Sequence, residues 1–136
     1  NNYYNELISL IEKEVYMSLL ESVMRCYNTN NFENLSAILS PDCKYSSHWV
    51  FDVMVGNDEI ENYFIQKSHA IESAKAFVVA KKGIITSPNN GECIVLFQKD
   101  CVENGPSCLL ILKERNGKIC GIHITDPGLF QFSIVE

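Results

Sequence analysis

The stretch SCLLILKERNGKICGIHIT, residues 107–125, decides the fold class of this protein. Two runs rich in Leu and Ile flank the pair Asn116-Gly117. Asn-Gly between two strand patterns is the strongest short-range signal of a β-hairpin, because both residues accept the positive φ angles of a tight turn. We therefore predict two antiparallel strands, Ser107–Glu114 and Lys118–Thr125.

The segment before this hairpin continues the same pattern. Lys75–Thr86 and Glu92–Cys101 are rich in apolar and β-branched residues, and clusters of Pro, Asn and Gly separate the runs. Consecutive hairpins make an antiparallel meander. Asp126-Pro127-Gly128 is predicted to end the sheet, and Leu129–Val135 is a tail apolar enough to pack against the body.

The first half of the chain is predicted to be mainly helical. Apolar residues recur every three to four positions over residues 3–29, and a break near Lys13–Glu14, making two helices, is an alternative. The other predicted elements are a short helix Phe32–Leu39, a strand Cys43–Val50, an irregular or extended segment Phe51–Val55 and a third helix Asp58–His69. Helices first and an antiparallel sheet last make an α+β fold.

Length and charge limit the possible functions. A chain of 136 residues fits one domain, so we predict a single domain over residues 1–136, with a helical extension at 1–14 and a tail at 127–136. The formal charge of −6 argues against nucleic acid as a partner, because its binders need a basic face. No apolar run approaches the roughly 20 residues that span a bilayer, so no membrane partner is expected. We expect a cytoplasmic protein; a cleaved leader would leave no trace in a chain that starts without Met.

The six cysteines are spread along the chain without a C-x-x-C pair. This spacing argues against a zinc site, and neither a metal nor a cofactor is expected. Reduced thiols in an apolar core are the favoured interpretation. Cys101 and Cys108 flank a loop centred on Asn104-Gly105, so we predict two reduced thiols that lie close together on adjacent strands.

Four short motifs follow one another in an order that resembles a known family. They are NTNNFENL at residues 28–35, LSPDCKY at 39–45, GNDEI at 56–60 followed by Tyr63, and NGKI at 116–119. Over about residues 15–126 the chain resembles the nuclear transport factor two-like (SnoaL-like) superfamily, which has a cystatin-like α+β cone fold. The resemblance implies helices packed in the concave face of a curved antiparallel sheet. It also implies a cone whose mouth holds a small apolar ligand, and an outer sheet face that makes a homodimer.

The alternation of strand residues assigns a ligand-binding wall. Side chains two residues apart share one face of a strand. We predict that five inward residues line one concavity together with the first helix: Tyr45, Ser47, Trp49, Ile122 and Ile124. The alternative is that they simply fill the cone, because apolar pockets and apolar cores use the same residue types. His123 should point to the opposite face as a hydrogen-bonded histidine.

Three polar residues near this wall are candidate catalytic residues. A His–Asp pair supports general acid–base chemistry when the carboxylate orients the ring. His48 with Asp52 or Asp126 could form such a pair, and an exposed position without catalytic role is the alternative for each.

The resemblance also allows a comparison with the ketosteroid isomerase branch of the superfamily. The position of that branch's general-base Asp falls at Ser47, that of its oxyanion Tyr at Val23, and that of its protonated Asp near Ile111. All three roles are lost. Serine does not abstract a carbon-bound proton at neutral pH without an activating base. Isomerase activity of that kind is therefore not expected.

These observations lead to one function hypothesis and two alternatives. The first is a dimerising domain that binds a small, largely apolar molecule and is non-enzymatic or vestigial. The second is a SnoaL-like cyclase, dehydratase or hydrolase that acts on a small apolar ring with His48. The third is a pure association module with a filled cone. A homodimer through the outer sheet face is expected because the strands carry apolar residues on both faces. The long first helix and the tail Leu129–Val135 are rival covers for that face.

Overall fold

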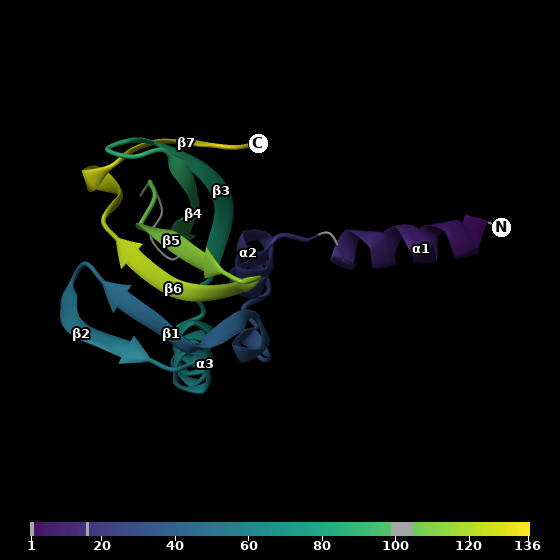
Figure 1. The fold of residues 1–136 in the computed structure, drawn as a ribbon, viewed down its shortest axis with the longest axis horizontal. Helices are drawn as coiled ribbons and strands as arrows, with labels where there is room; N and C mark the ends of the chain where they lie inside the picture. Colours follow the sequence, from purple (N-terminus) through teal and green to yellow (C-terminus); the bar gives the residue numbers. More distant parts are fainter. Residues whose placement is uncertain (1, 16, 99–104) are drawn as a thin grey trace.

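The computed structural model describes residues 2–15, 17–98 and 105–136 (Figure 1). In chain order the α-helices, 3₁₀ helices and strands are α1 (Asn2–Val15), α2 (Leu19–Thr29), η1 (Leu35–Ile38), β1 (Leu39–Ser47), β2 (Val50–Val55), α3 (Asn57–Ser73), β3 (Val78–Ser87), β4 (Gly91–Gln98), β5 (Cys108–Arg115), β6 (Lys118–Thr125), η2 (Pro127–Leu129) and β7 (Gln131–Ile134).

The strands form one seven-stranded sheet in the order β2-β1-β6-β5-β4-β3-β7. All neighbours are antiparallel except β1 and β6, which run parallel. The sheet is curved and unclosed (Figure 1). The predicted α+β class, with helices packed in the concave face of a curved, mainly antiparallel sheet, is confirmed.

The hairpin between β5 and β6 forms where the sequence predicted it. Asn116 and Gly117 have φ angles of 53° and 75°, the left-handed values that a tight turn of this kind requires. The ladder places Leu110 opposite Ile124 and Leu112 opposite Ile122. Leu110, Leu112, Ile122 and Ile124 therefore share the concave face, and Leu109, Ile111 and His123 share the outer face. The register shifts between Lys113 and Glu114, so this alternation does not extend to Ile119, which also packs in the concave core.

Two of the helices provide the inner layer. One core cluster joins α2 and α3 to the sheet through Leu20, Val23, Tyr27, Phe32, Ile60, Phe64, Ile94, Leu96, Leu110 and Ile122. The alternative of two helices within residues 3–29 is confirmed, and the break lies a few residues later than Lys13–Glu14. Its position follows from Ser18, whose side chain accepts a hydrogen bond from the backbone N–H of Glu21 at 3.0 Å and so caps the start of α2.

Figure 1 shows α1 projecting away from the rest of the chain. Its residues Tyr3, Tyr4, Leu7 and Leu10 are exposed. Over the described part of the chain, no helix is both long and apolar enough to cross a membrane.

The structure corrects one predicted element and refines two others. The short helix Phe32–Leu39 shrinks to η1, because Asn34 adopts a left-handed φ of 69° and Leu39 already pairs with Ile119 of β6. The segment Phe51–Val55, predicted as irregular or extended, belongs to the edge strand β2. The C-terminal tail adds a further strand, β7, which pairs antiparallel with β3.

The outer face of the sheet is covered by this C-terminal segment. A second core cluster joins Ile85, Cys93, Val95 and Leu109 of the sheet to Phe97, Ile111, Phe130, Phe132 and Ile134. Val95 and Leu109 are 0% exposed within a single chain. The tail therefore buries much of the apolar outer face from which the dimer was predicted. From the sequence we had named this tail, Leu129–Val135, as an alternative cover for that face.

The cysteines agree with the prediction as far as they are described. Cys26, Cys43, Cys93, Cys108 and Cys120 are free thiols, and Cys43 and Cys93 are buried. Cys101 lies outside the described residues, so its predicted proximity to Cys108 stays a prediction.

Candidate functional site

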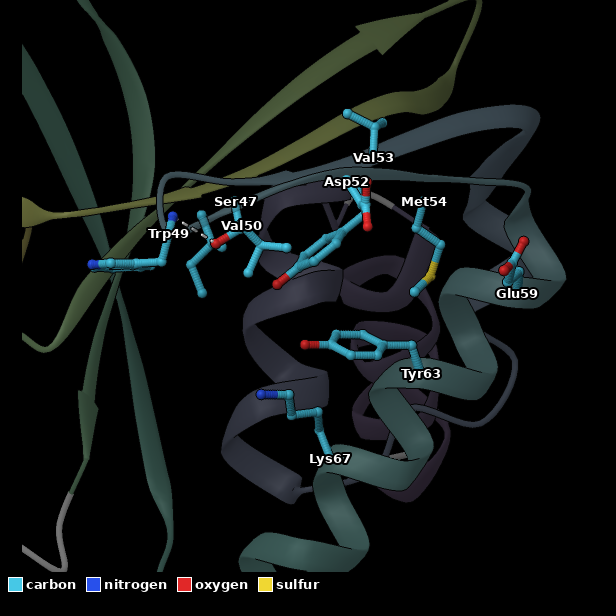
Figure 2. Close-up of a pocket in the computed structure, with 11 residues that line it drawn as sticks. Ser47, Trp49, Val50, Asp52, Val53, Met54, Glu59, Tyr63 and Lys67 are labelled. Atoms are coloured by element: carbon cyan, nitrogen blue, oxygen red, sulfur yellow. Dashed lines mark hydrogen bonds between the residues drawn. The ribbon is translucent and has the colours of Figure 1, made fainter.

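An open pocket of about 580 Å³ lies between the β1–β2 hairpin and α3 (Figure 2). Its lining residues are Tyr45, Ser47, Trp49, Val50, Asp52, Val53, Met54, Glu59, Tyr63, Lys67 and Ile124. The volume falls within the range of about 300–1,000 Å³ that is typical of small-molecule sites. Apolar and aromatic side chains make most of the wall, with a few polar groups among them.

One face of α3 forms a side of this pocket. Glu59, Tyr63 and Lys67 are four residues apart, and side chains at this spacing lie above one another on a helix. The following member of the series, Ile71, lines a second cavity. We assigned no pocket residue to this helix from the sequence; the i, i+4, i+8 spacing of Glu59, Tyr63 and Lys67 is the signal that could have found its pocket face.

This second cavity, of about 190 Å³, adjoins the pocket, and we call it the inner cavity because most of its lining residues belong to the concave core. Tyr45, Tyr63, Lys67 and Ile124 line both spaces, and we call these four residues the neck. Beyond the neck the inner cavity is lined mainly by apolar and aromatic residues: Tyr27, Phe32, Phe64, Ile71, Val78, Leu96 and Cys108, together with Gln98 and Ser107. The neck therefore lies where the lining of the open pocket meets the lining of the inner cavity.

Two tyrosines of the neck form a pair. The ring centroids of Tyr45 and Tyr63 are 5.3 Å apart, and the two ring planes are tilted by 47° to each other. Burial raises the pKa of Tyr45 above its usual range, and the nearby Tyr63 adds to the rise. Burial also raises the pKa of Tyr27 well above 10.0. The hydroxyl groups of Tyr45 and Tyr27 therefore keep their protons at neutral pH and are hydrogen-bond donors.

Lys67 supplies a positive charge at the neck. Its Nζ lies 5.4 Å from the centroid of the Tyr63 ring, a cation–π distance. Figure 2 shows Tyr63 between Lys67, on α3, and Asp52, on the wall formed by β2. The negative charges of Asp52 and Glu59 belong to the outer pocket and are absent from the lining of the inner cavity.

Comparison with protein-family models and with curated protein sequences gives no match. Solved structures do match. A steroid delta-isomerase from Pseudomonas aeruginosa aligns with a TM-score of 0.58 at 10% identity, over 79% of this chain and 75% of that one. A putative polyketide cyclase from Sinorhizobium meliloti aligns at 0.55 and 14%, over 78% and 92%. An NTF2-like protein of unknown function from Mesorhizobium loti aligns at 0.57 and 4%, over 79% and 86%.

This chain has the nuclear transport factor two-like fold. At these identities the likeness concerns the fold alone, so the chemistry of the site rests on the residues of this chain.

Within the nuclear transport factor two-like cone, four of the five predicted ligand-binding residues line the same pocket: Tyr45, Ser47, Trp49 and Ile124. Ile122 shares their face of the sheet, but it is buried in the core and does not line the pocket or the inner cavity. The helix that completes the pocket is α3, whereas we had predicted the first helix. The reason is topological, because β2 and α3 together flank the exposed side of β1.

The three candidate catalytic residues are not brought together. His48 is exposed in the β1–β2 turn, where its ring lies edge-on to Trp49 at 5.4 Å. Asp52 is exposed at the pocket mouth. Asp126 accepts a hydrogen bond from the backbone N–H of Gly128 at 2.8 Å and caps η2. Among the described residues no hydrogen bond or ion pair connects His48 with either carboxylate.

The positions carried over from the ketosteroid isomerase branch fall in three different places. Ser47 lines the pocket, Val23 is buried in the core behind it, and Ile111 packs on the outer face of the sheet. His123 also lies on the outer face, where its Nδ1 is 2.7 Å from the hydroxyl oxygen of Ser46. In the part of the chain that the structure describes, no group of three or more His, Cys, Asp or Glu side chains could hold a metal ion.

Proposed function

We propose that this protein binds a small, largely apolar molecule in the pocket between the β1–β2 hairpin and α3. The observation that carries the proposal is the open pocket of about 580 Å³ beside a largely apolar cavity that shares the four neck residues with it. Concave sites with mostly apolar walls and a few polar groups are the usual form of a small-molecule site. The three polar side chains at the neck, Tyr45, Tyr63 and Lys67, would orient the ligand.

The alternative of a pure association module is less favoured, because such a module would fill the cone with its own side chains. The pocket has a volume of about 580 Å³ and ionisable groups in its wall. This volume is above the lower limit of about 300 Å³ for small-molecule sites, which favours a binding site over a filled cone.

The alternative of a SnoaL-like cyclase, dehydratase or hydrolase lacks a residue pair to carry it. General acid–base chemistry needs the two groups within hydrogen-bond reach of each other or of one substrate. His48 and Asp126 lie outside the lining of the pocket, and of the three candidates only Asp52 belongs to it. Our proposal is therefore a binding domain without an acid–base pair of this kind.

The expected homodimer stays part of the proposal, although its structural basis has changed. The edge strand β2 carries exposed apolar side chains at Val50, Phe51, Val53 and Val55. An apolar, unpaired edge strand is a template for another chain, and natural proteins normally protect such edges with charges or a covering element. A second copy that pairs at β2 would extend the sheet and wall the pocket on its open side.

The binding proposal is tested by fluorescence titration with the neutral dye N-phenyl-1-naphthylamine. The wild-type protein should enhance the emission of the dye in a saturable manner. Ile124→Phe places a larger side chain in the neck and should weaken binding by about tenfold or more, whereas Ile111→Phe on the outer face should not. Circular dichroism melting shows whether each variant stays folded. Equal loss of binding in both variants, or no binding by the wild type, would count against the pocket.

A further inference from the structure

The polar groups of the pocket are distributed unevenly along its depth. The two carboxylates, Asp52 and Glu59, line only the outer pocket, whereas the amine of Lys67 lines both the outer pocket and the inner cavity. Glu59 and Lys67 lie eight residues apart on α3, a rise of about 12 Å along the helix axis. At physiological salt this separation exceeds the Debye length of about 8 Å, so Glu59 has little effect on a charge next to Lys67.

The positive charge of Lys67 has no carboxylate partner in the described part of the chain. Neither of the ion pairs found there includes it, and its contact is with the face of the Tyr63 ring. The charge is close enough to the inner cavity to act on the thiol of Cys108, where it opposes the rise in that thiol's pKa caused by burial. An unpaired ammonium group at the entrance of an apolar cavity attracts an anion there.

The Tyr45–Tyr63 pair adds directional hydrogen bonding to this charge. Each of the two hydroxyl groups has one proton that it can donate. Both side chains line the neck, so either proton can be donated to a ligand oxygen atom there. Hydrogen bonds from neutral donors and from an ammonium group to a carboxylate are roughly twice as strong as those between neutral groups.

From this arrangement we propose that the ligand is an apolar organic anion, whose carboxylate lies at the neck against Lys67 and the Tyr45–Tyr63 pair. The apolar part of the ligand enters the inner cavity, which is lined mainly by aromatic and aliphatic side chains. The carboxylate stays on the pocket side, where Lys67 is exposed and water can reach it, so the cost of burying a charge is avoided. This inference rests on the proposed binding function and names its ligand class.

The opposite polarity is the competing outcome, because Asp52 and Glu59 also line the outer pocket and would favour an amine. A second competing site for anions is the outer groove of about 400 Å³ between β1, β6 and β5, which Lys44, Lys113 and Arg115 line. A useful experiment must separate these two possibilities from the neck.

The test uses three ligands with the same ten-carbon chain and different head groups: decanoate, decanol and decylamine. Each is titrated against protein with bound N-phenyl-1-naphthylamine, and the concentration that displaces half of the dye is measured at pH 7. Decanoate should displace the dye at a concentration about tenfold or more below that of decylamine, with decanol between them. Lys67→Met keeps the length of the side chain and removes its charge, and should abolish the preference for decanoate. Tyr63→Phe should weaken decanoate several-fold and leave decanol unchanged.

Lys113→Met is the matched control, because it removes a lysine from the outer groove and should leave all three displacement curves unchanged. Stronger displacement by decylamine than by decanoate would overturn the proposal, as would a preference for decanoate that survives Lys67→Met. A wild-type protein that binds neither the dye nor any of the three ligands refutes the binding function itself, and this outcome is distinct from a wrong head-group preference.

Discussion

The second core on the outer face of the sheet makes a sharp prediction at Gly83 of β3. A Cβ atom at this position would lie 2.7 Å from Cγ2 of Val95 and 2.8 Å from Sγ of Cys93. Both neighbours are 0% exposed, and the backbone oxygen of Ser133 in β7 lies 3.4 Å from the same point. Carbon atoms in van der Waals contact are about 3.5–4.0 Å apart, so Gly83→Ala forces a shift of roughly 1 Å in packed side chains.

Overpacking of this kind costs about 1–3 kcal/mol, and the lower chain entropy of alanine in the unfolded state offsets about 0.4–1 kcal/mol of it. For a chain of 136 residues a change of 1 kcal/mol shifts Tm by about 4 °C. The central values, about 2 and 0.7 kcal/mol, leave a net cost of about 1.3 kcal/mol, so we expect Gly83→Ala to lower Tm by about 5 °C in a thermal melt followed by circular dichroism.

The control is Gly91→Ala at the start of β4, where an added Cβ has no atom within 4 Å. Its effect should be within about 0.5 kcal/mol. In a Val95→Ala background the further cost of Gly83→Ala should fall, because the closest clashing atom is gone and the contact with Sγ of Cys93 remains. Equal Tm values for the two glycine variants would refute the close packing of this outer core.

Three further predictions concern the thiols and the assembly. Burial raises the pKa of Cys43 and Cys93 to about 11 from the ordinary value of 9.0, so thiol reagents at pH 8 should modify these two thiols slowly until the protein unfolds. The same two thiols ionise at lower pH in the unfolded chain than in the folded one. The free energy of unfolding should therefore fall as the pH rises from 9 to 11. Thiol titration of the unfolded, unreduced protein should give six free thiols, and a lower count would contradict the reduced state predicted for Cys101 and Cys108. If β2 mediates a dimer, light scattering at micromolar concentration should give a mass of about twice 15.4 kDa. The variant Phe51→Lys should reduce this mass to that of one chain. A wild-type mass near 15.4 kDa would exclude the dimer under these conditions.

The sequence was most informative where local chemistry determines structure. The bounds of β6 were predicted without error, because Asn116-Gly117 fixes the turn and the alternation after it fixes the register. The same alternation placed Tyr45, Ser47 and Ile124 on the concave face. These predictions needed only contacts between residues close in sequence or on one strand.

The errors involve contacts between segments far apart in the sequence. The tail became β7 because the free edge of β3 accepts its backbone hydrogen bonds, and periodicity within four residues does not reveal such a partner. The pocket face of α3 was missed because Glu59 and Lys67 are polar, and a search for an apolar stripe ignores polar residues that face a cavity. Ile122 was assigned to the pocket wall because parity gives the face of a strand but not the depth of a residue on it.

The central claim is that a ligand occupies the concave side of the sheet at the neck. Selective ¹³C labelling of isoleucine methyl groups tests it most directly, because isoleucines lie on both faces of the sheet. On titration with decanoate, the methyl resonances of Ile124 and Ile71 should shift in a saturable manner, while those of Ile111 and Ile134 in the outer cluster should not. Shifts confined to Ile111 and Ile134, or no saturable shift at any isoleucine, would contradict the proposed site.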